Sequence, residues 1–416
     1  MRTGRRSAVA PARSGRGGLS LAFGLLLALV AAFPWDDALG YPTETISVVK
    51  LLGLAIGAAY LTTTVWRAPF VWPSTLPAVA IFLGVAAVSL LASGDVGSGT
   101  GPALRYLLFA GLFFLFVQIV RTRDQLVVVA GVLTASAAVA AAVGLIRFFT
   151  GAAERASGPI GEANDFAYVL ATALPLGLYL LGRGGRARIA WFACIVVIGA
   201  GVLGTLSRGA IVGLVLAAVW SALRGRVRLR NVVAAVAVLA VLAGAALTFE
   251  RPFVEDRLRA KSLVADDNID SRVALWRGAI EMAEDHPVLG VGTGRYPVRA
   301  ADYVVDDPLH LVEPVTHNAY LQILAENGVP GLLAFGAFVV GTWLVLRRTH
   351  RMAVAVAAGD EETARLASAL QAAHIVAVVG AVFLSVAIAP PLWLVGAMAV
   401  VLRATVDQSE PAADRS

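Results

Sequence analysis

The sequence predicts an all-α polytopic membrane protein with about twelve transmembrane helices and one large, partly helical extracytoplasmic loop. Of its 416 residues, 58% are hydrophobic and only 15% are charged, a balance that a soluble domain of this length does not show. Apolar stretches long enough to cross a hydrocarbon core of about 30 Å recur along the chain. Because lipid cannot satisfy open backbone groups, we expect these stretches to be helices.

The predicted spans are joined by short loops, with one exception. They lie near residues 18–34, 44–66, 74–92, 103–121, 126–148, 164–182, 189–204, 207–222, 231–249, 318–346, 366–388 and 391–403. The predicted divisions are a basic tail at 1–17, spans in 18–249, a large loop at 250–316, a surface helix with further spans in 317–403, and a tail at 404–416. The basic start resembles the n-region of a signal peptide, but no Ala-x-Ala-like site follows, so we expect an uncleaved first helix.

Arginines in the short loops predict the orientation. They fall at positions 2, 5, 6, 13, 16, 67, 121, 123, 183, 186, 188, 224, 226, 228, 230, 347, 348 and 351. With twelve spans all of these lie on one side, which the positive-inside rule makes cytoplasmic. Both termini are then cytoplasmic, and the net charge of +6 reflects topology; no basic face with interleaved aromatics indicates nucleic-acid binding. The single cysteine, Cys194, lies inside a span, which excludes a disulfide framework or thiolate metal site.

The long loop carries a helical pattern. Asp270 and Ser271 form a possible N-cap, after which Val273, Trp276, Ile280 and Ala283 recur at helical spacing. We therefore expect an amphipathic helix on the membrane surface with its Trp at the interface. The following "GVGTGRY" precedes no strand, which favours a tight turn over a dinucleotide-binding loop.

A histidine stands where this loop meets the next apolar run. The stretch "NGVPG" at 327–331 predicts a helix break, leaving a short surface helix at 318–327 and a span near 331–346. His317 precedes the surface helix, whose dipole disfavours an imidazolium, so we expect a neutral ring that can accept a proton. Position alone leaves two interpretations open: a general base or a helix cap. Glu326 falls on the opposite face of that helix, and we interpret it as structural.

Four cations lie near the predicted outer ends of spans: Lys50, Arg105, Arg147 and Arg208. Charges at membrane depth mark functional cavities by default, although the first three could each extend singly to the surface. Arginine suits bidentate phosphate recognition, and a lipid diphosphate presents that anion at headgroup depth. No metal-ligand pair is evident, and the acidic stretch at 264–270 is interpreted as solvated loop, so no metal or other cofactor is expected.

Several motifs resemble the O-antigen ligase and O-antigen polymerase superfamily. "THNAYLQILAENGVPG" is similar to that family's His-Asn signature, and "SRVALWRGAIEMAEDHPVLGVGTGRY", "LGTLSRGA" and "GPIGEANDFAYVLATALPL" are similar to its other segments, in the family's order over about 158–335. The resemblance implies a bacterial plasma-membrane enzyme of cell-surface polysaccharide synthesis. Its donor would be a glycan on undecaprenyl diphosphate in the outer leaflet, and transfer to an acceptor hydroxyl would be metal-independent and inverting.

The resemblance also implies roles for particular residues. His317 matches the family's general base, while Arg208 and Arg272 match its diphosphate-binding arginines. Arg105, Arg147 and Lys50 are additional candidates for diphosphate binding, chosen from their depth alone. Ligases and polymerases differ only in the acceptor, which the sequence does not specify. The alternative is a small-anion or bicarbonate transporter, but transporters place charges at the midplane, commonly within repeated halves. A scaffold would leave the outer arginines unexplained.

Overall fold

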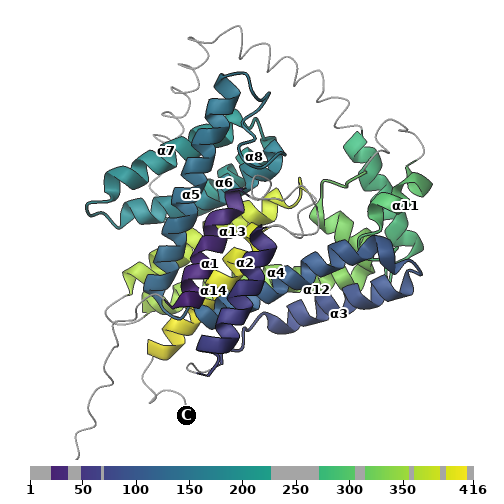
Figure 1. Ribbon diagram of the computed structural model, residues 1–416, viewed down its shortest axis with the longest axis horizontal. Coiled ribbons are helices and arrows are strands. Elements are labelled where there is room, and N and C mark those ends of the chain that lie inside the picture. Colours follow the sequence, from purple (N-terminus) through teal and green to yellow (C-terminus); the bar gives the residue numbers. More distant parts are fainter. Residues whose placement is uncertain are drawn as a thin grey trace, which may run out of the picture.

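The computed structural model describes residues 20–35, 48–66, 70–225, 271–304, 314–355, 360–384 and 390–409 (Figure 1). Within these ranges every regular element is a helix, which confirms the all-α class. In chain order they are α1 (Leu21–Ala32), α2 (Val48–Ala59), α3 (Leu76–Ala92), α4 (Val96–Ile119), α5 (Arg123–Phe149), α6 (Ala163–Gly182), α7 (Arg188–Gly204), α8 (Arg208–Leu223), α11 (Tyr296–Tyr303), α12 (Ala319–Ala355), α13 (Glu361–Gly380) and α14 (Pro390–Ser409). A 3₁₀ turn (Phe33–Trp35) extends α1, a π turn (Tyr60–Thr64) extends α2, and a further helix runs through 271–285.

Each predicted span within the described ranges contains a helix, whereas the predicted span at 231–249 lies outside them. By length and composition α4, α5, α6, α12, α13 and α14 can cross a membrane. The apolar helices α1, α2, α3, α7 and α8 are shorter. The chain is thus a polytopic helical membrane protein, and the count of twelve spans stays a prediction.

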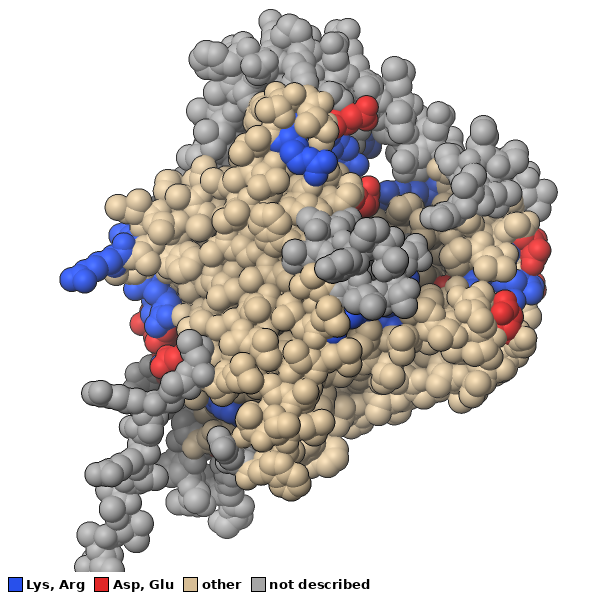
Figure 2. Space-filling view, viewed as in Figure 1, with Lys and Arg blue, Asp and Glu red and all other residues tan. Residues whose placement is uncertain are grey.

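The flank of the helical body is apolar. Large side chains that normally avoid water are exposed there, including Leu54 at 69%, Leu91 at 69% and Ile189 at 82%. Figure 2 shows a broad area without charged residues, with most lysine, arginine, aspartate and glutamate atoms toward the edges of the view. An exposed apolar surface of this extent fits a lipid environment.

Polar residues at span boundaries fix where helices begin. Thr122 caps α5 through a capping box, since its hydroxyl accepts from Gln125 N at 3.2 Å and the Gln125 side chain accepts from Thr122 N. Asp360 caps α13 by accepting from Thr363 N at 3.1 Å. These caps define helix ends that lie outside the apolar interior.

Small residues let the helices approach closely in the middle of the bundle. Helix α6 packs against α5, α7 and α13, and α12 packs against α3, α13 and α14. A Cβ atom added to Gly380 would lie 2.4 Å from the Tyr168 ring, and one added to Gly209 would lie 2.9 Å from Phe383. Glycine at these positions therefore sets the spacing of α13 against α6 and α8.

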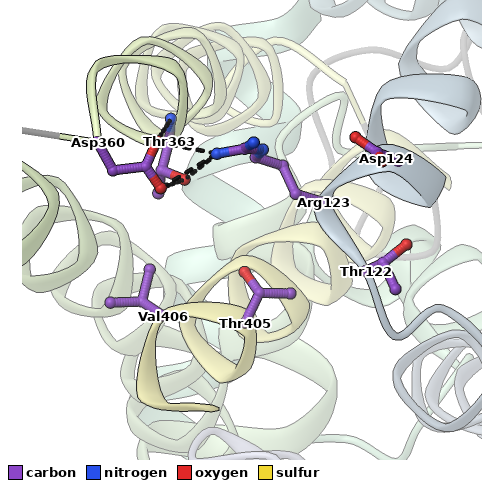
Figure 3. Close-up of a pocket in the computed structure, with 7 residues that line it drawn as sticks. All are labelled: Thr122, Arg123, Asp124, Asp360, Thr363, Thr405 and Val406. Atoms are coloured by element: carbon purple, nitrogen blue, oxygen red, sulfur yellow. Dashed lines mark hydrogen bonds and ion pairs between the residues drawn. The ribbon is translucent and has the colours of Figure 1, made fainter. Parts of the chain in front are cut away.

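An ion-pair network closes one end of the bundle. Arg123 pairs with Asp360 at 2.9 Å and with Glu362 at 3.4 Å, and Arg183 pairs with Glu362 at 2.9 Å. Figure 3 shows the Arg123 guanidinium directed at Asp360 and Thr363 across a pocket. The network joins the start of α5, the end of α6 and the start of α13, all predicted to be cytoplasmic. The start of α6 and the turn between α7 and α8, both predicted to be outside, meet at the other end.

Candidate active site

The break predicted in the long helix is present at Gly328. Its φ of 65° and ψ of −171° are not helical, and Pro330 has no backbone N–H to donate. The N–H of Val329 leaves the helical ladder and donates to the Pro287 carbonyl at 2.8 Å. The break therefore separates the first turns of α12 from its span and opens its backbone to the large loop.

Carbonyls freed by the break bind the glycine-rich turn. Val291 N donates to the Ala325 carbonyl at 2.8 Å, and Gly292 N donates to the Glu326 carbonyl at 3.2 Å. Both carbonyls would otherwise accept from residues at the break. Gly290, like Gly292, has a positive φ and no room for a Cβ atom. The prediction of a tight turn is confirmed.

The Glu326 side chain fastens the same turn. This fully buried carboxylate accepts from Gly294 N at 2.9 Å, Tyr296 N at 3.3 Å and Gln322 Nε2 at 3.2 Å. All of these partners belong to the loop or to the same short helix. The contacts support the structural interpretation of Glu326.

The helix through 271–285 is confirmed, and most of the residues that it buries in protein differ from those of its predicted membrane-facing side. Leu275, Ala279 and Met282 are buried, whereas Ile280 is 42% exposed. The buried residues pack with Tyr296 and others in a small core within the loop itself. The small core therefore buries a stripe of this helix rotated from the predicted one, and contact of the predicted apolar face with the membrane surface stays a prediction.

This helix also holds the segment that carries His317. The indole N–H of Trp276 donates to the Thr316 carbonyl at 2.8 Å, so Trp276 anchors the chain one residue before the histidine. His317 itself has a φ of 48°, in the left-handed region that non-glycine residues rarely occupy. Strained backbone of this kind is often retained for function.

The helix cap is Asn318, not His317. The Asn318 Oδ1 atom accepts from Tyr320 N at 3.1 Å and from Leu321 N at 3.2 Å, which satisfies the first donors of α12. These two capping bonds do not involve the imidazole. The geometry therefore removes the main support for interpreting His317 as a cap.

A second polar group lies at the start of α6. The Arg155 Nε donates to the Thr205 carbonyl at 2.7 Å, and Arg155 Nη2 donates to Asn164 Oδ1 at 2.8 Å. Glu162, which caps α6, accepts from the Asn164 backbone at 3.0 Å and from its side chain at 2.5 Å. These bonds bring together loops that are far apart in the sequence.

Electrostatic effects connect the two groups. Burial lowers the pKa of the His317 imidazole, the Arg272 charge lowers it further, and Glu162 opposes both effects. Burial also lowers the pKa of Arg272 and of Arg155, again opposed by Glu162, although arginine stays protonated at physiological pH. We call Arg155, Glu162, Arg272 and His317 the His317 cluster. It offers a neutral base beside two half-buried cations and one carboxylate.

Two further predicted cations lie at the same end. Arg208 is exposed and begins α8, three residues after the Thr205 carbonyl that binds Arg155. Arg147 is exposed in the last turn of α5, and its Nη1 donates to the Gly158 carbonyl at 2.6 Å. That bond supports the loop leading to Glu162.

The other two candidates are less closely linked to the cluster. Arg105 is exposed on α4, and among the described residues no hydrogen bond or ion pair joins it to the His317 cluster. Lys50 is half-buried near the start of α2, which packs against α1 and α4, helices that carry no cluster residue. Their proposed contact with substrate stays a prediction.

Sequence reasoning missed Arg155 and Glu162. Arg155 lies in the loop at 149–163, and the other short loops on the predicted outer side carry no arginine, so this exception could have identified it. Glu162 gave no such signal, because its role depends on contacts between distant loops. The acidic stretch at 264–270 lies outside the described residues.

The fold and these charges define a polytopic membrane protein with a mixed base and cation site at one end of its helical bundle. Comparison with known families identifies the rest: residues 192–336 match the family described as O-antigen ligase. This segment is therefore similar to the O-antigen ligase family, which supports the resemblance to the O-antigen ligase and polymerase superfamily that the motifs predicted. Arg208, Arg272 and His317 fall within the matched residues. A search of curated proteins found no match.

Proposed function

We propose that the chain is a membrane glycosyltransferase that moves a glycan from undecaprenyl diphosphate to an acceptor hydroxyl at the outer face of the bacterial plasma membrane. The observation that carries this proposal is the placement of His317 within electrostatic reach of Arg272, inside the matched domain. A base that is neutral near pH 7 beside a fixed cation suits a reaction that removes a proton while a diphosphate leaves.

The proposed step needs no metal. The acceptor oxygen attacks the anomeric carbon from the face opposite the diphosphate, and its proton passes to the His317 imidazole. The bond between the anomeric carbon and the diphosphate oxygen breaks, and its electron pair leaves with the diphosphate. Arg208 and Arg272 bind that anion and stabilise its developing charge. Attack from the opposite face inverts the anomeric configuration.

Ligase and polymerase activities share this chemistry and differ in the molecule that supplies the hydroxyl. A ligase would use a lipid A core or a protein, and a polymerase would use a second lipid-linked repeat unit. The transporter alternative gains no support from the family match, and the charges of the His317 cluster lie on loops or at helix ends, not in the middle of spans.

The proposal is tested with the purified full chain in lipid nanodiscs, supplied with undecaprenyl-diphosphate oligosaccharide and each class of acceptor. We expect glycan transfer that is equal with and without EDTA, and loss of transfer in Arg272→Ala with the protein still folded. Arg272→Lys should recover only part of the activity, because an ammonium lacks the bidentate geometry. Loss of wild-type transfer in EDTA, or full activity of Arg272→Ala, would contradict the proposed diphosphate site.

A further inference from the structure

An arginine from a neighbouring loop holds the end of α7. The Arg155 Nε donates to the Thr205 carbonyl at 2.7 Å, and the next backbone N–H, of Ala156, donates to the Gly204 carbonyl at 3.0 Å. These carbonyls lie at the C-terminus of α7, where a helix leaves its last acceptors without internal partners. A guanidinium at this end also interacts favourably with the helix dipole.

The same guanidinium reaches the start of α6. Its Nη2 atom donates to Asn164 Oδ1 at 2.8 Å, and two hydrogen bonds from Asn164 to Glu162 fix that amide in turn. Arg155 therefore joins the α7–α8 turn to the first turn of α6. The planar guanidinium donates to the two acceptors from separate nitrogens, a geometry that the single nitrogen of lysine does not reproduce.

The turn at 205–207, to which Arg155 is hydrogen-bonded, determines the position of Arg208. Leu206 has a φ of 55°, an uncommon conformation for a non-glycine residue. Ser207 is 5% exposed and occupies the N-cap position, and Arg208 is the first residue of α8. A cation is disfavoured at a helix N-terminus, so α8 itself does not stabilise the charge of Arg208.

We propose that Arg155 is a positioning residue for Arg208: it fixes the turn at 205–207 against the start of α6 and so sets the spacing between Arg208 and the pair Arg272 and His317. The inference rests on the proposed function, in which Arg208 and Arg272 bind the same diphosphate. Two cations that bind a single anion need a fixed separation, which packing and hydrogen bonds around them supply.

Direct binding of substrate by Arg155 is the competing interpretation. Protein acceptors already occupy its Nε and one Nη2 donor, and the residue is half-buried between two loops. Arg208, by contrast, is exposed and three residues further along. The observations therefore favour a supporting role for Arg155.

The first test needs no substrate. Ser207→Cys is introduced into a Cys194→Ser background, and the rate of labelling by a water-soluble maleimide reports how often the buried turn opens. We expect Arg155→Ala to raise this rate by about tenfold, as for the loss of one charge-assisted hydrogen bond, and Arg155→Lys to raise it less. Arg183→Ala, which breaks an ion pair at the other end of α6, serves as the matched control and should leave the rate unchanged. Equal rates in Arg155→Ala and its parent would overturn the inference.

The second test measures the affinity of the full chain in nanodiscs for undecaprenyl diphosphate, in a double-mutant cycle of Arg155→Ala and Arg208→Ala. If Arg155 acts through Arg208, the double variant binds no more weakly than Arg208→Ala alone. Additive losses would mean that Arg155 contacts the diphosphate itself, and an unchanged affinity in Arg155→Ala would mean that the turn does not serve Arg208. Either result overturns the positioning role. Absence of binding by the wild type would instead contradict the proposed function, together with this role, while the labelling test would still report on the turn.

Discussion

At the scale of single residues, the sequence left open whether His317 caps the following helix or acts as a base, and the structure gives the capping role to Asn318. Asn318 carries the cap, with its side chain bound to two backbone N–H groups. His317 has a strained backbone and a lowered pKa, caused first by burial and then by Arg272. The expected direction, a neutral ring, agrees with the sequence, but the helix dipole proposed there is not the main cause.

Glu162 gives a pH-dependent prediction. Among the described residues, the Arg272 charge lowers the pKa of His317 and the Glu162 charge raises it. A base with a depressed pKa is active above that pKa and loses activity as the pH falls through it. Glu162→Gln keeps an acceptor for Asn164 but removes the charge, so the acidic limb of the kcat/KM profile should move to lower pH. A limb that stays in place, with only the melting temperature lowered, would make Glu162 a structural residue alone.

At the scale of elements, the loop and α12 are joined through the break at Gly328. The carbonyls that this break frees accept from Val291 and Gly292, and Thr293 donates to Asn327 Oδ1 at 2.6 Å. The ends of α3, α4 and α12 lie beside the helices of the loop (Figure 1). The glycine turn therefore sets the position of the loop that carries Arg272.

Gly290→Ala tests this docking. Its φ is 66°, and an added Cβ atom would lie 2.3 Å from the Glu326 carbonyl carbon. We expect a loss of stability of about 1–3 kcal/mol from the backbone conformation, increased by the collision. Gly84→Ala is the control, because that helical glycine has nothing within 4 Å of an added Cβ atom and alanine favours helix. Melting curves in detergent that are equal for the two variants would contradict the proposed docking.

Helices and breaks could be predicted because they depend on local signals. Apolar runs of membrane length and the Gly-Val-Pro-Gly break are signals of this kind. The buried face of the helix at 271–285 could not be predicted, because packing in a small core within the loop determines which of its residues are buried. The hydrogen bonds of Arg155 could not be predicted either. They join residues 155 and 205, which only the packing of α5, α6 and α7 brings together.

At the scale of the whole molecule, two groups of described polar residues lie at opposite ends of α6. Arg123, Arg183 and Glu362 meet at one end, and Arg155, Thr205 and His317 belong to the other. We predict that the second end is outside the cell. A reporter that works only after export should be active when it is fused after Asp302. A reporter that works only in the cytoplasm should be active when it is fused after Gly185. The reverse pattern would invert the orientation and the site built on it.

The account's central claim is that the base and cation pair at the outer end performs the transfer. The most direct measurement is the transfer rate and the donor affinity of His317→Asn, because asparagine tolerates the left-handed backbone at this position. We predict that donor affinity stays close to that of the wild type, since the arginines bind the diphosphate, while the transfer rate falls about a hundredfold or more. Near-normal transfer by His317→Asn would contradict the claim and leave His317 as a structural residue.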